Sequence, residues 1–157
     1  IKIVDVNKNV QGDVYIEENK IVEVGEVKNS KHDVVIDGKN KALIPGLINM
    51  HTHAAMVLFR SYADDMPLME WLKNKIWPLE EKLKAKDIYY GTKLACLEMI
   101  KSGTTTFNDM YFEVEAIAKA VEEIGIRACI SSAFIDFFDA NVLKERLKRI
   151  EHDLKKL

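Results

Sequence analysis

The sequence lacks the signatures of several common protein classes. Its two cysteines, Cys96 and Cys129, lie far apart and form no CxxC pair, so neither a disulfide framework nor a thiolate zinc site is indicated. No apolar run reaches the roughly 18 residues of a membrane span, and no charged-then-apolar signal peptide opens the chain. The net charge of -2 argues against nucleic acid as a partner, because such proteins present a basic face. We therefore expect a cytoplasmic protein that contacts neither a membrane nor nucleic acid.

Motifs that bind nucleotide phosphates are absent too. There is no GxGxxG and no P-loop lysine, and the HxE and PCxxC signature of the cytidine-deaminase type of zinc site is also missing. What is present is an ordinary globular composition, with 48% apolar and 31% charged residues. The 157 residues are enough for one domain with a sizeable core.

Residues 1–41 alternate Val and Ile with polar residues in short runs separated by turn residues. This alternation predicts a small antiparallel sheet, which needs a partner surface to be stable. The expected strands contain Ile3-Val4, Val14–Ile16, Ile21–Val24 and Val34–Ile36. We interpret residues 1–41 as part of a small β domain.

From residue 42 onward, apolar strands alternate with segments of helical periodicity. The expected strands are 42–50, 104–109 and 126–135, and the expected helices are 66–84 with a break at Pro78, 85–101, 113–124 and 141–157. Gly103 and Gly125 are expected to end two of these helices. An order in which strands and helices alternate predicts parallel βα units, of which about three are present.

Two histidines, His51 and His53, follow the apolar run 42–50. Side chains two residues apart in an extended strand point to the same face. Two neutral imidazoles on one face suit a divalent metal, with zinc the first choice and iron the second. The alternative is that both are ordinary polar residues leaving a strand. His32, in the β segment, and His152, in a charged helix, are not expected to complete the site.

The string Pro45-Gly46-Leu47-Ile48-Asn49-Met50-His51-Thr52-His53 resembles the start of the metal-dependent amidohydrolase superfamily. That resemblance implies an α/β fold in which a small N-terminal β-sandwich segment precedes a (β/α)8 TIM-type barrel, here covering residues 42–157. A barrel takes about 250 residues. The chain is therefore interpreted as the N-terminal portion of a longer enzyme. A third His and a proton-shuttling Asp are expected from later strands, so no catalytic residue is identified here and this portion alone is expected to be inactive.

One branch of that superfamily is matched more closely. Its pattern covers Glu70-Trp71-Leu72, Trp77–Glu80, Tyr89–Thr92 and Gly103–Tyr111. The branch comprises methylthioadenosine/S-adenosylhomocysteine deaminases and 5′-deoxyadenosine deaminases, and the resemblance implies that Glu80 binds the ribose hydroxyls of the substrate. A carboxylate can accept two hydrogen bonds from a vicinal diol. Considered without that resemblance, Glu80 is a charged position on a solvated helix.

The expected reaction is hydrolytic deamination of adenine nucleosides to inosine analogues and ammonia by a metal-activated hydroxide. Asn108 and Asp109, at the end of a strand, are expected either to support the site or simply to close the strand. Ser132 stands where some members carry an Arg that contacts the 5′ substituent, which favours smaller neutral 5′ groups. Alternatives are a guanine deaminase, a chlorohydrolase-like enzyme, or a non-catalytic fragment that binds or oligomerises. The sequence leaves open whether the protein forms a homo-oligomer.

Overall fold

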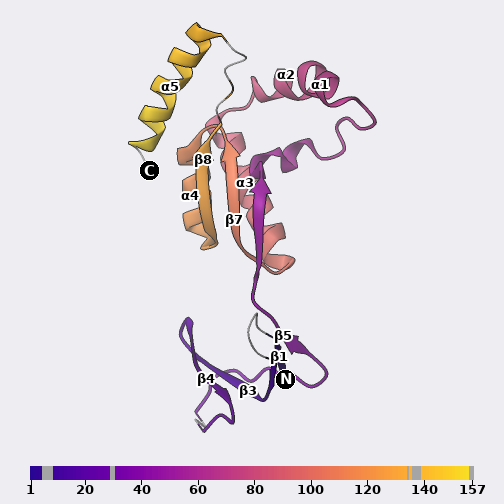
Figure 1. Cartoon of the computed structure of the whole chain (residues 1–157), viewed down its shortest axis with the longest axis vertical. Helices are drawn as coiled ribbons and strands as arrows, with labels where there is room; N and C mark the ends of the chain where they lie inside the picture. The colour runs from indigo at the N-terminus through magenta and orange to yellow at the C-terminus, as the bar shows by residue number, and fades with distance from the viewer. Residues whose placement is uncertain (5–8, 29–30, 134, 136–138, 156–157) are drawn as a thin grey trace. The chain divides into compact units, whose positions relative to one another are not determined.

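The computed structural model describes residues 1–4, 9–28, 31–133, 135 and 139–155. These residues divide into two compact units, Ile1–Gly46 and Leu47–Leu157. Figure 1 shows the chain coloured from its N-terminus to its C-terminus, with most of its helices and strands labelled. The second unit carries the histidine pair, and its sheet and helices are what position the candidate site.

The first unit is built from short strands. They are β1 (Lys2–Val4), β2 (Asn9–Gln11), β3 (Asp13–Glu17), β4 (Lys20–Gly25) and β5 (Ala42–Leu43). β3 and β4 form the expected antiparallel hairpin, with Glu18 at a φ of 53° in its turn. β1 pairs antiparallel with β2 but parallel with β5, so the prediction of a wholly antiparallel sheet is wrong.

The expected strand at Val34–Ile36 is also wrong. The three residues lie outside any strand, and all three side chains are largely exposed. An apolar run forms a strand only when a neighbouring backbone accepts its hydrogen bonds. Val34–Ile36 forms no strand pairing with the other described residues of this unit, so the β propensity of its side chains alone gave a wrong prediction.

In the second unit, a three-stranded parallel sheet has the order β6-β7-β8, with β6 at Leu47–Thr52, β7 at Thr104–Tyr111 and β8 at Arg127–Ser132. The prediction of parallel βα units is confirmed. The single strand predicted at 42–50 is wrong, because the chain leaves β5 after Leu43 and begins β6 at Leu47. Pro45 has no N–H for a ladder and interrupts the run. The sheet formed by the described residues is open and does not close into a barrel.

Helices connect and flank these strands. They are η1 (Ala54–Phe59, 3₁₀), α1 (Leu68–Trp71), η2 (Leu72–Ile76, π), α2 (Trp77–Glu80), α3 (Ala85–Lys101), α4 (Val114–Ile124) and α5 (Ala140–Leu154). Pro78 lies in the first turn of α2, where a missing N–H removes no helical bond. In the part of the chain that the structure describes, no helix is both long and apolar enough to cross a membrane.

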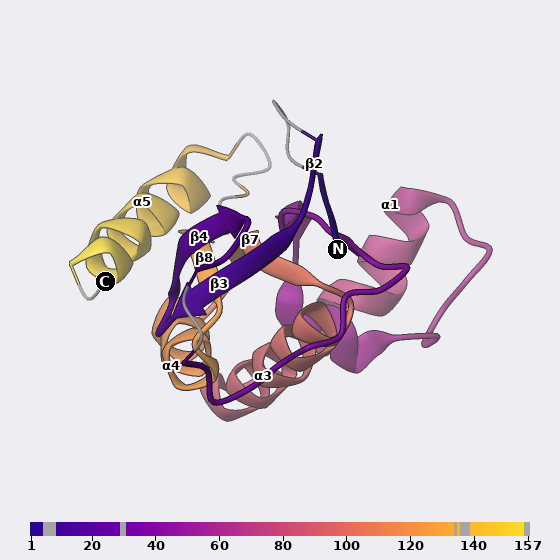
Figure 2. The same ribbon diagram turned by 90° about the horizontal axis from the view of Figure 1, so that it is seen from below.

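Local signals set the limits of α3 as predicted. The Asp87 carboxylate accepts a hydrogen bond from the Lys84 N–H at 2.9 Å, which satisfies a free donor at the helix start. At the other end, Gly103 takes a φ of 86°, a left-handed conformation that costs glycine little. Helix α4 ends in the same way at Gly125, with a φ of 78°. Figure 2 shows α3 and α4 running side by side.

The core of this unit lies between the sheet and these two helices. One cluster gathers around Phe107 and a second around Tyr111; their buried members are Ala54, Ala95, Cys96, Phe107 and Ile126 in the first, and Ala55, Ile88, Tyr111 and Ile117 in the second. Gly91 of α3 lies so close to η1 that an added Cβ would come within 2.9 Å of the Ala55 carbonyl oxygen. This close approach fixes the turn that directly follows His53.

Candidate functional site

The carboxyl end of β6 brings the two predicted metal ligands together. The ring centroids of His51 and His53 are 5.2 Å apart, and the ring planes are nearly perpendicular at 83°. His51 is exposed and His53 is partly buried. Catalytic residues of parallel α/β enzymes gather at this end of the strands, so the pair lies where a site is expected.

The His53 ring is oriented by the neighbouring strand. Its Nδ1 lies 2.8 Å from the main-chain carbonyl oxygen of Met110, in β7. A carbonyl oxygen only accepts hydrogen bonds, so Nδ1 must carry the proton that is donated. In the neutral ring this leaves the lone pair on Nε2. Metal-binding histidines are commonly oriented in this way, with the second ring nitrogen donating to a carbonyl or carboxylate.

Asp109 holds the residues on both sides of His53. Its side chain is fully buried, and its Oδ1 accepts hydrogen bonds from the Ala54 N–H and the Thr52 hydroxyl, both at 2.8 Å. Its Oδ2 is buried with no partner among the described residues. Burial raises the pKa of Asp109 above its ordinary value, although the bonds from Ala54 and Thr52 and the nearby His53 act in the opposite direction. Asp109 thus fixes the turn that presents His53.

Asn108 makes a different contact. Its side-chain amide donates to the main-chain carbonyl of Met50 at 3.1 Å and so joins β7 to β6. Sequence reasoning left open whether Asn108 and Asp109 support the site or close a strand. The structure shows that Asn108 ties the two strands together, while Asp109 contacts the chain immediately around His53.

Glu80 is the last residue of α2 and is partly buried. Its Oε1 accepts a hydrogen bond from the Tyr111 hydroxyl at 2.7 Å. Tyr111 is only 3% exposed, and burial, followed by the bond to Glu80, raises the pKa of Tyr111 well above its ordinary range. Its ring centroid lies 6.4 Å from that of His53. Glu80 and His53 therefore both adjoin Tyr111.

Sequence reasoning missed the role of Tyr111. Its position could have indicated that role, because Tyr111 is the last residue of β7 and so lies at the same edge of the sheet as the histidine pair. The other two histidines, His32 and His152, are exposed. No group of three His, Cys, Asp or Glu side chains placed to hold a metal ion occurs among the described residues. The pair is therefore a partial set of ligands.

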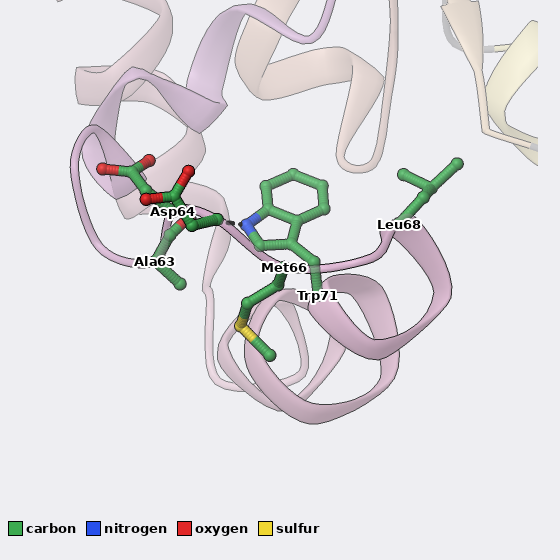
Figure 3. A pocket seen from close by; sticks show the side chains of 6 residues that line it. Ala63, Asp64, Met66, Leu68 and Trp71 are labelled. Atoms are coloured by element: carbon green, nitrogen blue, oxygen red, sulfur yellow. Dashed lines mark hydrogen bonds between the residues drawn. The ribbon is translucent and has the colours of Figure 1, made fainter.

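The second unit has two open hollows, of which one lies away from the histidine pair and the other borders it. One, of about 370 Å³, lies beside Trp71 (Figure 3), and its lining residues are Ala63, Asp64, Asp65, Met66, Leu68 and Trp71. Trp71 is partly buried, lines this hollow and donates its indole N–H to the Ala63 carbonyl at 3.0 Å. The second hollow, of about 530 Å³, reaches His53 from the side of η1 and α3.

At the end of β8, the Ser132 hydroxyl donates a hydrogen bond to the Asp153 carboxylate of α5 at 2.9 Å. The position where some members of the resembled family carry a cation therefore holds a hydroxyl paired with an acid. This arrangement adds no positive charge to the carboxyl end of the sheet.

A model of the amidohydrolase family matches residues 42–157, about three quarters of the chain. The chain belongs to the amidohydrolase family. The matched region contains the histidine pair, Asp109, Glu80 and Tyr111, so the site described above lies wholly within it.

Two curated relatives indicate which branch of the family this chain resembles. The chain is 61% identical, over 94% of its length, to 5-methylthioadenosine/S-adenosylhomocysteine deaminase 1 of Archaeoglobus fulgidus. It is 57% identical, over 96% of its length, to 5′-deoxyadenosine deaminase of Methanocaldococcus jannaschii. The chain spans 35% and 36% of these two relatives, respectively, or about a third of their length.

Solved structures agree with this assignment. An adenosine deaminase from Xanthomonas campestris with bound zinc matches with a TM-score of 0.58 at 35% identity, over 70% of this chain and 28% of that one. Escherichia coli guanine deaminase matches with a TM-score of 0.60 over 87% of this chain and 36% of that one. At 19% identity, the second match establishes similarity of fold alone.

Proposed function

We propose that the complete protein deaminates adenine nucleosides of the 5′-deoxyadenosine, 5′-methylthioadenosine and S-adenosylhomocysteine class. The observation that carries the proposal is the 61% and 57% identity to deaminases named for these substrates. We also propose that residues 42–157 begin a (β/α)8 barrel and that residues 1–41 belong to a small β domain. Parallel order in β6, β7 and β8 supports the barrel, because that fold is built from repeated βα units.

His51 and His53 would hold a divalent ion, for which zinc is the first choice and iron the second. The donor set fits, because the rings are adjacent and the bond from His53 Nδ1 to Met110 leaves Nε2 free to coordinate. The solved adenosine deaminase with bound zinc supports the choice of metal. Such an ion lowers the pKa of a coordinated water toward about 7 and so supplies hydroxide near neutral pH.

Glu80 would orient the nucleoside. Its Oε1 is engaged by Tyr111, and the carboxylate retains lone pairs that can accept hydrogen bonds from the two ribose hydroxyls. Water and the adenine nucleoside give the inosine analogue and ammonia; the amino group at C6 is replaced by oxygen. The remaining metal ligands and the group that transfers protons are proposed to come from other parts of the complete protein.

The pairing of Ser132 with Asp153 supports a preference among the 5′ groups. A site with an acid here and no cation would hold the carboxylate-bearing tail of S-adenosylhomocysteine less well than a neutral group. We therefore propose that 5′-deoxyadenosine and 5′-methylthioadenosine are the better substrates.

The test is deamination by the metal-loaded complete protein, followed by the absorbance change from adenine to hypoxanthine. 5′-Deoxyadenosine and 5′-methylthioadenosine should be turned over faster than S-adenosylhomocysteine, and guanine should not be turned over. If none of the three nucleosides is deaminated, the proposal fails. Turnover of guanine instead would identify the alternative, a guanine deaminase.

A second measurement tests the metal ligands. His51→Ala should lose bound metal and activity together, whereas His152→Ala, which changes an exposed histidine of α5, should keep both. Elemental analysis of the purified proteins gives the metal content independently of activity. Retention of a full equivalent of metal by His51→Ala would contradict the assigned role.

A further inference from the structure

Tyr111 joins the two halves of the proposed site. Its hydroxyl is bonded to Glu80, and its ring lies beside His53. We propose that Tyr111 is a positioning residue that fixes the Glu80 carboxylate for the sugar diol and so sets the preference for substrates that carry one. The inference rests on the proposed deamination of nucleosides.

The tyrosine itself is firmly held. It is 3% exposed and packs in a core cluster with Ala55, Ile88 and Ile117. Its main-chain carbonyl accepts a hydrogen bond from the Ala133 N–H at 3.0 Å, beyond the paired part of β8. A ring held by the core on one side and by the sheet on the other presents its hydroxyl at one place.

Glu80 needs such an anchor more than most carboxylates. It is the last residue of α2, where the continuous helical run that starts at Leu68 ends, and its flexible side chain is not enclosed by the core. A carboxylate that must be ordered when a ligand binds weakens binding, and one that is already ordered does not. Burial raises the pKa of the Tyr111 phenol, so at neutral pH Tyr111 carries the proton that it donates to Glu80.

The chain contains a matched control. Tyr89 of α3 also donates its hydroxyl to a glutamate, Glu123 of α4, but this pair is on the outer side of the helices. Tyr89→Phe removes the same hydroxyl from the same kind of pair without touching the site. Both tyrosine variants keep an aromatic ring, so the packing around it is retained.

The experiment compares two substrates of the metal-loaded complete protein, 5′-deoxyadenosine and 2′,3′-dideoxyadenosine, of which only the first has the diol. The measured quantity is the ratio of their kcat/KM values. Tyr111→Phe should lower this ratio about tenfold, as expected for a lost hydrogen bond to a charged group. The loss should appear in KM for 5′-deoxyadenosine, with kcat within about threefold. Tyr89→Phe should leave the ratio unchanged.

A purely structural role predicts a different pattern. If Tyr111→Phe lowers kcat/KM equally for both substrates, or changes neither, this inference is overturned while deamination by the wild-type protein still supports the proposed function. Absence of any deamination by the wild-type protein would overturn both. In a Glu80→Gln background, Tyr111→Phe should have little further effect on the ratio, because the two residues act through one contact.

Discussion

The two tyrosine–glutamate pairs of this chain share one chemistry in two surroundings. Tyr111 is buried at the carboxyl end of the sheet, and its hydroxyl bonds Glu80. Tyr89 is on the outer side of α3, where Lys93 also contacts both its hydroxyl and the carboxylate of Glu123. Water and the Lys93 cation can replace any one bond in the outer group, whereas the inner bond comes from a buried tyrosine that water reaches less easily. We therefore expect the inner pair to hold its carboxylate more firmly than the outer pair, which links α3 to α4.

The aspartates show the same contrast. Asp109 and Asp139 each accept hydrogen bonds from backbone N–H groups, the first from Ala54 and the second from Asn141 and Val142 at the start of α5. Asp109 is fully buried and Asp139 is exposed. At the sheet end, removing Asp109 leaves the buried Ala54 N–H without an acceptor, so loss of a polar contact there should cost more stability than loss of its outer counterpart.

The largest expected effect is that of Asp109→Ala. It should lower the free energy of unfolding by about 2 kcal/mol, because the buried Ala54 N–H loses its acceptor, whereas the Thr52 hydroxyl can still donate to the Asn108 carbonyl. Asp139→Ala, an exposed helix cap, should cost about 1 kcal/mol. Denaturant unfolding of both variants gives the comparison. Equal losses of unfolding free energy in the two variants would show that burial at the sheet end does not strengthen the contribution of the aspartate.

Thr52→Val should come next, with a loss of about 1.5 kcal/mol. The Thr52 hydroxyl lies 2.8 Å from Asp109 Oδ1 and 2.9 Å from the Asn108 carbonyl, and valine keeps its shape without the donor. The control is Thr105→Val, whose exposed hydroxyl makes only a 3.4 Å contact with the Leu47 carbonyl. That variant should change the unfolding free energy by less than about 0.5 kcal/mol. A larger loss of stability for Thr105→Val than for Thr52→Val would contradict the expected difference between the sheet end and the exposed positions.

Tyr111→Phe should lower the free energy of unfolding by about 1 kcal/mol, and Tyr89→Phe by less than half of that. Each variant keeps its aromatic ring, that of residue 111 in the core and that of residue 89 on the outer side of α3, so the difference reports mainly the hydroxyl. Thermal or denaturant unfolding measured in one buffer suffices. If Tyr89→Phe proved the more costly change, the outer network would be the stronger of the two.

Local signals in the sequence predicted much of this arrangement. The convergence of His51 and His53 follows from their spacing in a strand, and the limits of α3 follow from Asp87 and Gly103. These features depend on residues a few positions apart. The same local reasoning could not see that Pro45 separates β5 from β6 within one apolar run.

Long-range contacts lay beyond such reasoning. The bond between Tyr111 and Glu80 joins residues 31 positions apart, one ending a strand and the other a short helix. Their meeting depends on how α2 returns to the sheet, which no periodicity encodes. Asp109 was identifiable as a strand end, but its contact with Ala54 depends on the parallel pairing of β6 with β7.

The smallest expected effect is in the outer group and depends on pH. Hydrogen bonds from Tyr89, and then from Lys93, lower the pKa of Glu123 below its ordinary value of 4.5. A carboxylate with a lowered pKa in the folded state stabilises the fold above its unfolded pKa and loses that contribution as the pH falls through the folded pKa. Glu123→Gln should therefore be slightly less stable than the wild type at about pH 7, and the gap should narrow at an acidic pH below the ordinary glutamate pKa of 4.5. Unfolding curves at both pH values check this, and a gap that widened on acidification would show that Glu123 is held by something other than its charge.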